Sequence, residues 1–352
     1  MKPKVTVLTA VYNGLPYLEY AIESTLNQTY SNFEYMIIDD ASPDKSVVEF
    51  IKSFDDPRIK LIENKENLGV SNTINKALSL ITTPYVVRLD QDDISLPNRI
   101  EEQVNFLETH PSISIICSWE KTIDSHGKKI RDWKKTINNY GEFLGPVLLG
   151  LCPIWHPSIA FRKDALFDAG GFNSDYVRAE DFEVTTRLAL KRHGAAIVQK
   201  FHVFHRWHDQ RQSNEFLKEQ TDMAERIQKE AINRFLNIED AEKLGAFLRL
   251  QKGNANNVFD KKYIVDMYDL LMLMLKNVAI KQELNADELH SLKKVIFKRV
   301  GVGVFFVPAY KFLPAFLFMP VFFLLSPLFS NSLHKLLSRI YNALQELRYG
   351  IR

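Results

Sequence analysis

Four short apolar runs in the first ninety residues alternate with amphipathic stretches of helical length, and this alternation constrains the fold more than any other feature. The apolar runs are residues 5–11, 33–39, 59–63 and 85–89. Between them, apolar side chains recur at helical spacing, as at Leu18, Ile22 and Leu26. Strands joined through helices run parallel, with right-handed crossovers. The sequence therefore predicts an α/β fold with a Rossmann-like sheet flanked by helices.

The loops that follow three of these strands carry polar or acidic side chains. They are residues 10–13, 39–44 and 90–93. Ligands of open α/β sheets bind in the crevice beyond the carboxyl ends of the strands. We therefore expect these three loops to line one ligand-binding crevice.

The sequence pattern changes after Trp119. Shorter strand-like pieces and loops continue to about Trp207, and helical patterns follow from Asn214 to about Lys298. We predict three regions: a ligand-binding α/β domain over residues 1–213, a helical region over residues 214–300, and an apolar terminal segment over residues 301–352.

Charge and cysteine content argue against several classes of function. A net charge of +2 and a pI of about 8.3 give no reason to expect nucleic acid as a partner. Cys117 and Cys152 lie in apolar contexts, which argues against a disulfide framework and a cysteine metal site. Residues 1–4 lead into the first strand without the apolar core of a signal peptide. We therefore expect a cytoplasmic protein.

The most informative chemistry lies in the acidic cluster RLDQDD at residues 88–93. Asp90, Asp92 and Asp93 follow an apolar strand and would repel one another without a positive partner. Carboxylate oxygens suit Mg²⁺ or Mn²⁺, and a bound diphosphate can complete the octahedral shell of the ion. A solvated acidic turn is the alternative. The helix start at Pro97 favours the metal site.

Further motifs occur in order along the chain. They are VTVLTAVYNG (5–14), LNQTY (26–30), IIDDAS (37–42), ENLG (66–69), RLDQDD (88–93), AED (179–181) and HRWH (205–208). Together they resemble the family 2 glycosyltransferases of the GT-A fold over about the first 210 residues. The resemblance implies a GT-A catalytic domain over residues 1–213. Gln91 inside the acidic triplet departs from the common pattern and leaves the sugar specificity open.

The resemblance assigns the nucleotide site residue by residue. Ala10 and Tyr12 would line the nucleotide pocket. The Asp40 carboxylate would accept a hydrogen bond from the uracil N–H, which selects uridine. Asp39 is expected to brace the turn instead. Asn67 either touches the nucleotide or only closes its own turn.

Four more residues would serve the ribose, the metal and the diphosphate. Asp90 would lie near the ribose and the metal, and Asp92 would be the main metal ligand. Asp93 would orient the loop or the donor sugar. His208 matches a position that reaches the metal or the phosphates, and an imidazole ligand suits Mn²⁺ better than Mg²⁺. The expected cofactor is therefore Mn²⁺ or Mg²⁺.

The AED motif matches the family position of the general base. Asp181 would take the proton of the acceptor hydroxyl on the face opposite the departing diphosphate, which inverts the anomeric configuration. Acidic residues that only complement a helix dipole are the alternative. Glu180, His156 and Trp207 would contact the acceptor or the sugars, with core packing as the alternative for Trp207.

The apolar terminal segment includes residues 312–329, which carry no charge and are flanked by cations. Pro314, Pro320 and Pro327 would break the backbone hydrogen bonding that a membrane-spanning helix must complete. We expect residues 301–352 to lie on the membrane surface, with the cations at anionic headgroups. A packing arm or a homo-oligomer contact is the alternative.

These residues predict inverting transfer of a sugar from a UDP-sugar to a saccharide or lipid-linked saccharide in surface glycan assembly, at the inner face of the cell membrane. A processive polysaccharide synthase is one rival, but no Gln-X-X-Arg-Trp motif follows Asn214. A non-catalytic nucleotide- or carbohydrate-binding scaffold is another, although Asp90, Asp92 and Asp181 are all present. A nucleotidyltransferase would need a Gly-rich basic phosphate loop, and residues 10–14 hold one glycine and no lysine.

Overall fold

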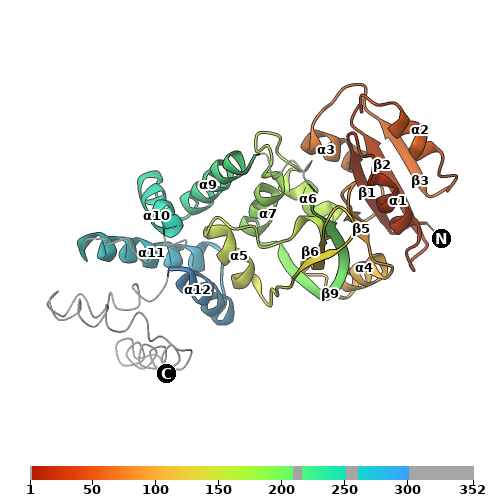
Figure 1. Ribbon diagram of the computed structural model, residues 1–352. Coiled ribbons are helices and arrows are strands. Elements are labelled where there is room, and N and C mark those ends of the chain that lie inside the picture. Colours follow the sequence, from red (N-terminus) through yellow and green to blue (C-terminus); the bar gives the residue numbers. More distant parts are fainter. Residues whose placement is uncertain (1, 209–215, 251–260, 301–352) are drawn as a thin grey trace.

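The computed structural model describes residues 2–208, 216–250 and 261–300. Within these residues a nine-stranded mixed sheet is covered by helices on both faces, and a helical region follows it (Figure 1). This arrangement confirms the predicted fold class. The expected membrane-surface segment, residues 301–352, lies outside the described residues. No helix within the described part of the chain is long and apolar enough to cross a membrane.

The first half of the sheet is parallel. Its strands are β1 (Val5–Val11), β2 (Phe33–Asp39), β3 (Ile59–Glu63) and β4 (Tyr85–Arg88), in the order β3-β2-β1-β4. The connecting helices are α1 (Leu18–Leu26), α2 (Ser46–Lys52) and α3 (Val70–Leu80). Leu18 and Ile22 of α1 are buried in the core on one face of the sheet, and Ile74 and Leu78 of α3 in the core on the other. The helical spacing predicted both packed faces.

The second half of the sheet mixes strand directions. Its strands are β8 (Ala160–Arg162), β6 (Ile113–Ile123), β9 (Gly194–Arg206), β5 (Ile94–Ser95) and β7 (Lys129–Trp133). We expected only short strand-like pieces here, but β6 and β9 span 11 and 13 residues. That expectation was wrong because the polar side chains of Glu120 and His205, which interrupt the apolar pattern, are buried inside the sheet.

The remaining helices follow the strands in chain order. They are α4 (Arg99–Thr109), α5 (Tyr140–Leu148), the short 3-10 helix η1 (His156–Ser158), α6 (Lys163–Ala169), α7 (Glu180–Leu190), α9 (Leu217–Asn233), α10 (Ile238–Leu250), α11 (Lys261–Lys281) and α12 (Ala286–Val300). Phe143 and Leu144 of α5 share one core with Leu271 and Met274 of α11. The predicted boundary after residue 213 falls outside the described residues, and core residues from both sides of it pack together.

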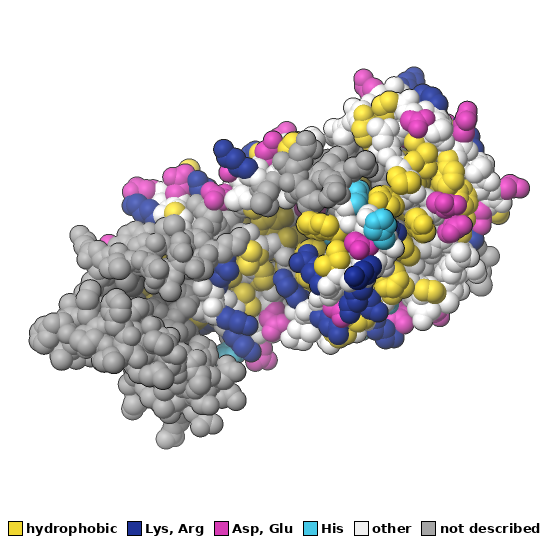
Figure 2. Space-filling model, viewed as in Figure 1, with side chains coloured by type: hydrophobic (Ala, Val, Ile, Leu, Met, Phe, Trp, Pro, Cys, Tyr) yellow, Lys and Arg dark blue, Asp and Glu magenta, His cyan; other side chains and the backbone are white. Residues whose placement is uncertain are grey.

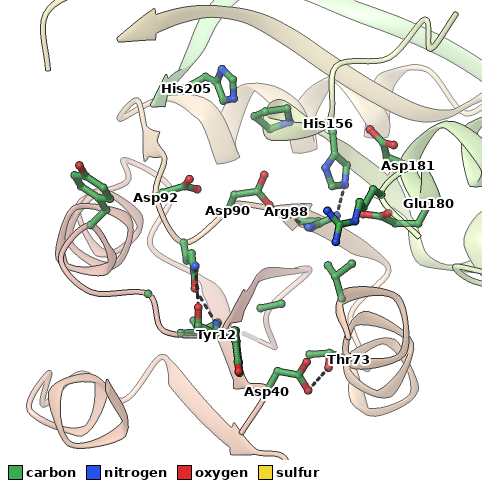
Figure 3. Close-up of a pocket in the computed structure, with 18 of the residues that line it drawn as sticks. Tyr12, Asp40, Thr73, Arg88, Asp90, Asp92, His156, Glu180, Asp181 and His205 are labelled. Carbon is green, nitrogen blue, oxygen red and sulfur yellow. Dashed lines mark hydrogen bonds and ion pairs between the residues drawn. The ribbon is translucent and has the colours of Figure 1, made fainter. Parts of the chain in front are cut away.

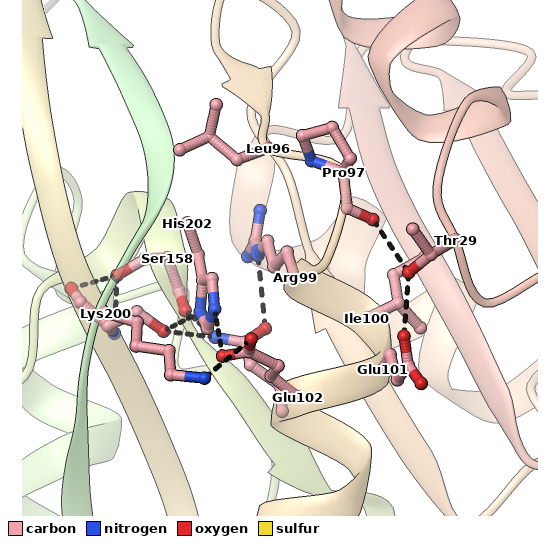
Figure 4. Close-up of polar contacts among 12 residues, drawn as sticks. Thr29, Leu96, Pro97, Arg99, Ile100, Glu101, Glu102, Ser158, Lys200 and His202 are labelled. Carbon is pink, nitrogen blue, oxygen red and sulfur yellow. Dashed lines mark hydrogen bonds and ion pairs between the residues drawn. The ribbon is translucent and has the colours of Figure 1, made fainter.

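A buried polar network joins the start of α4 to the end of β4. Figure 4 shows Arg99 and Ser158, two of its members. Arg99 has no exposed surface and donates to the carbonyl oxygens of Arg88 at 2.5 Å and Ile159 at 3.3 Å. Its Nε donates to Gln103 Oε1 at 3.1 Å, and Gln103 Nε2 donates to the Ser158 carbonyl at 2.7 Å. Burial lowers the pKa of Arg99 to about 10, so the guanidinium stays charged at neutral pH.

Two glycines of α5 allow its backbone to approach α12 closely. A Cβ atom at Gly141 would lie 1.9 Å from the Glu288 carbonyl oxygen, and one at Gly145 would lie 2.7 Å from Val295 Cγ1. The helical C-terminal region is therefore seated directly against the α/β domain.

We expect Gly141→Ala to lower the free energy of unfolding by about 1–3 kcal/mol, because the new methyl group overpacks this backbone contact. The same change at an exposed helix position raises stability by up to about 1 kcal/mol. Urea unfolding checks the difference, with Lys276→Ala on the exposed face of α11 as a control that changes stability by less than about 0.5 kcal/mol. Unchanged or raised stability in Gly141→Ala would contradict the contact between α5 and α12.

Candidate active site

A cavity of about 900 Å³ opens beyond the carboxyl ends of β1, β2 and β4 (Figure 3). The three predicted loops line it together with η1, the start of α7 and the residues after β9. The predicted residues in its lining are Ala10, Tyr12, Asp40, Asn67, Asp90, Asp92, His156, Glu180, Asp181, Trp207 and His208. Asp93 is fully buried and lies outside the lining.

Four donors hold the Asp40 carboxylate at the end of β2. Oδ1 accepts from Asn64 Nδ2 at 2.7 Å, the Leu68 amide at 2.9 Å and Thr73 Oγ1 at 2.7 Å, and Oδ2 accepts from the Gly69 amide at 2.9 Å. A carboxylate has about four lone-pair sites, two on each oxygen. A ligand N–H would therefore meet Oδ2. Nothing in the sequence pattern had pointed to Asn64 or Thr73.

The neighbouring Asp39 has the bracing role expected of it. Its Oδ1 accepts from Ser42 Oγ at 2.5 Å and its Oδ2 from the Ser42 amide at 3.1 Å. Asp39 is only 1% exposed. The two adjacent carboxylates thus face different surroundings, and Asp40 is the one at the cavity.

Gln91 ties the loop after β1 to the acidic loop after β4. Its Oε1 accepts from the Tyr12 amide at 2.9 Å, and its Nε2 donates to the Tyr12 carbonyl at 3.2 Å. A Cβ atom at Gly14 would lie 2.9 Å from Gln91 Oε1, which favours glycine there. Gln91 therefore positions the backbone of Tyr12, a residue that is 41% exposed and lines the cavity.

Each carboxylate of the acidic loop has a partner within the protein. The pairs are Asp90 Oδ1 with Arg88 Nη2 at 3.0 Å, Asp92 Oδ2 with His208 Nε2 at 3.0 Å, and Asp93 Oδ1 with the Arg206 amide at 2.9 Å. These partners satisfy one oxygen of each carboxylate, so mutual repulsion, from which the sequence predicted a metal ion, does not by itself require one. The metal site has to be judged from the donor atoms instead.

Asp92 and His208 bring a carboxylate oxygen and an imidazole nitrogen to one point at the cavity. Their side chains are 18% and 11% exposed, and the Tyr17 ring packs 4.8 Å from the His208 ring. The described residues contain no group of three or more His, Cys, Asp or Glu side chains that could hold a metal ion. One oxygen and one nitrogen suit a Mg²⁺ or Mn²⁺ site that substrate phosphates and water complete.

Two acids of different burial begin α7. Glu180 is only 8% exposed, and this burial, reinforced by the charge of Asp181, raises the pKa of Glu180 to about 7. Asp181 is partly exposed at the cavity, and its Oδ1 accepts from the Phe182 amide at 2.7 Å. A glutamic acid near neutral pKa can bind a ligand hydroxyl as donor or as acceptor.

Arg88 connects the acidic loop to η1. Its guanidinium pairs with Asp90 at 3.0 Å and contacts the Nε2 atom of His156 (Figure 3). Arg88 is 5% exposed, and its positive charge opposes the rise in the pKa of Glu180. The sequence marked Arg88 only as part of a motif, whereas the structure makes it the link between three predicted site residues.

Two tryptophans also line the cavity. Trp155 lines the cavity, with its ring 5.3 Å from Trp133 and 6.0 Å from His205. Trp207 also lines it and is 42% exposed, so core packing does not account for this side chain.

Comparisons with known sequences agree with this site. The family model described as Glycosyl transferase family 2 matches residues 6–169. An uncharacterized glycosyltransferase of Haemophilus influenzae is 32% identical over 249 residues, which cover 67% of this chain and 75% of that protein. The putative glycosyltransferase EpsE of Bacillus subtilis is 33% identical over 191 residues, which cover 53% of this chain and 66% of EpsE.

Solved glycosyltransferase structures share the fold. Residues 1–349 of S. aureus TarS in complex with UDP-GlcNAc give a TM-score of 0.55 at 16% identity, covering 88% of this chain and 92% of that one. The mannosyltransferase PcManGT of Pyrobaculum calidifontis, in complex with GDP-Man and Mn²⁺, gives 0.51 at 19% identity, covering 88% and 85%. At these identities the likeness supports the fold alone. The curated relatives carry the assignment, and this chain belongs to glycosyl transferase family 2.

Proposed function

We propose that this glycosyltransferase moves a sugar from a UDP-sugar to a hydroxyl group of a saccharide or lipid-linked saccharide, with inversion at the anomeric carbon. The observation that carries the proposal is one cavity of about 900 Å³ lined by Asp40, the Asp92–His208 pair and Asp181. A base-recognising carboxylate, a diphosphate site and a proton acceptor are the three groups that such a transfer requires.

The nucleoside would bind between the loops after β1 and β2. The uracil N–H would donate to Asp40 Oδ2, and the exposed ring of Tyr12 would cover the base. Asn67 and Ala10 line the same cavity. The bound UDP-GlcNAc of TarS supports a uridine donor, although a guanine N–H would also suit a carboxylate and PcManGT was solved with GDP-Man.

The diphosphate would bind beside Asp92 and His208, which would hold Mn²⁺ or Mg²⁺ together with its oxygens. The ion would offset the negative charge that builds up on the leaving diphosphate. Asp90 lies in the same loop, and Arg88 at 3.0 Å already balances its charge. The Mn²⁺ in PcManGT supports this assignment by analogy of fold.

The acceptor hydroxyl would donate its proton to Asp181, the more exposed of the two acidic residues that begin α7. Glu180, His156 and Trp207 would position the sugars around the reacting atoms. Direct displacement by the hydroxyl inverts the anomeric configuration. We also propose that the protein binds peripherally to the inner face of the cell membrane through residues 301–352.

Asp92→Asn should abolish Mn²⁺-dependent UDP binding, because it removes the anionic metal ligand and keeps the size of the side chain. Calorimetry of UDP with and without Mn²⁺ measures the change, and transfer activity should fall in parallel. Asp287→Asn, at an exposed position of α12, is the matched control and should bind UDP as the native protein does. Unchanged Mn²⁺-dependent affinity in Asp92→Asn would remove Asp92 from the metal site.

Asp181→Asn should lower kcat by a factor on the order of 100 or more and leave UDP-sugar affinity within about twofold, because it removes only the proton acceptor. Glu180→Gln is the matched neighbour and should lose less kcat, since an amide still hydrogen bonds to a hydroxyl. Steady-state rates and calorimetry separate the two effects. If Glu180→Gln loses more activity than Asp181→Asn, Glu180 is the base.

A further inference from the structure

The β6–β7 hairpin and the residues after it concentrate positive charge beside the cavity. Residues 121–135 hold six Lys or Arg and two Asp, although the whole chain carries a net charge of only +2. The exposed cations are Lys128, Lys129, Arg131, Lys134 and Lys135. Figure 2 shows Lys and Arg side chains gathered over the region of β6 and β9, next to exposed histidines.

Aromatic rings lie beneath these cations and continue into the cavity. Trp155 lines the cavity, and Trp133 lies 5.3 Å from it. Lys135 Nζ lies 5.5 Å from the centre of the Trp133 ring, and Lys134 Nζ lies 5.3 Å from that of Trp119. All three tryptophan residues are partly exposed. Such rings pack against the apolar faces of sugars, while the ammonium groups above them are placed to pair with anions.

Arg131 joins this hairpin surface to the transfer site. Its side chain is exposed, its Nε lies 3.4 Å from Thr122 Oγ1, and it lines the cavity together with Asp181. Lys134 and Lys135 lie outside the cavity lining, so they would reach a ligand only beyond the donor site. A ligand chain that passes these lysines and enters the cavity would therefore reach Asp181, the proposed base.

We propose that the acceptor is an anionic glycan, carrying phosphate or carboxylate groups, and that residues 121–135 with Trp155 form its binding track. This inference rests on the proposed function, because the track leads to the proposed site of transfer. Anionic lipid headgroups would meet the same cations. The indole rings under the lysines and their continuity with the cavity favour a saccharide.

The test measures binding of three oligosaccharides of equal length: a neutral maltooligosaccharide, the same oligomer carrying phosphate, and an oligogalacturonate. The chain has four tryptophans: Trp133 and Trp155 lie in the track, Trp207 lines the cavity, and the Trp119 ring packs against Lys134. Intrinsic fluorescence therefore reports binding. At least one charged oligomer should bind at concentrations where the neutral one does not, and its affinity should fall as salt is added. The two charged probes distinguish phosphate from carboxylate.

The double variant Lys134→Gln/Lys135→Gln should weaken binding of the charged oligomer roughly fivefold, as expected for two exposed ion pairs. The matched control Lys276→Gln/Lys294→Gln removes the same charge from α11 and α12 and should bind the oligomer as the native protein does. If both double variants lose the same affinity for the charged oligomer, the effect comes from net charge alone, and the proposed track is wrong.

Equal binding of neutral and charged oligomers would also overturn the track, as would binding to phosphatidylglycerol vesicles without binding to any charged oligomer. UDP-sugar affinity is measured on the same native protein. A protein that binds no UDP-sugar contradicts the proposed function, whereas UDP-sugar binding without charge selectivity contradicts only the anionic acceptor.

Discussion

The buried guanidinium of Arg99 joins two parts of the chain that line the cavity, the end of β4 and the residues around η1. It has no exposed surface, and it holds the carbonyl oxygens of Arg88 at 2.5 Å and Ile159 at 3.3 Å. Removing a partner from a buried charge costs several kcal/mol, so this junction tolerates little displacement. The end of β4, where the acidic loop begins, is therefore set against the chain that leads from η1 into β8.

In the acidic loop that begins at this junction, each carboxylate has its own partner. Arg88 balances Asp90, and the Arg206 amide holds the buried Asp93 beneath the cavity. Of the three acidic-loop carboxylates, Asp92 is the one paired with a side chain that can also be a metal ligand, His208 at 3.0 Å. The three carboxylates of the acidic loop thus have three different partners. At the start of α7, Glu180 and Asp181 differ in burial instead, Glu180 being buried and Asp181 more exposed.

The parallel half of the sheet and the cavity beyond it could be predicted from the sequence, because apolar periodicity and the carboxyl-end rule act over short stretches. The long strands β6 and β9 could not, since Glu120 and His205 are polar and yet buried. The partners of the site residues were missed for another reason. Thr73 reaches Asp40 across 33 residues and Gln91 reaches Tyr12 across 79, and no local spacing marks such contacts.

Calorimetric titration of the native protein with UDP-sugars and GDP-mannose, each with and without Mn²⁺, tests the central claim most directly. That claim is one cavity in which Asp40 reads the base and Asp92 with His208 binds the diphosphate through a divalent ion. It predicts tighter binding of UDP-sugars than of GDP-mannose, and loss of that binding when EDTA removes the metal. Equal affinity for both nucleotides, or metal-independent binding of UDP-sugars, would contradict it.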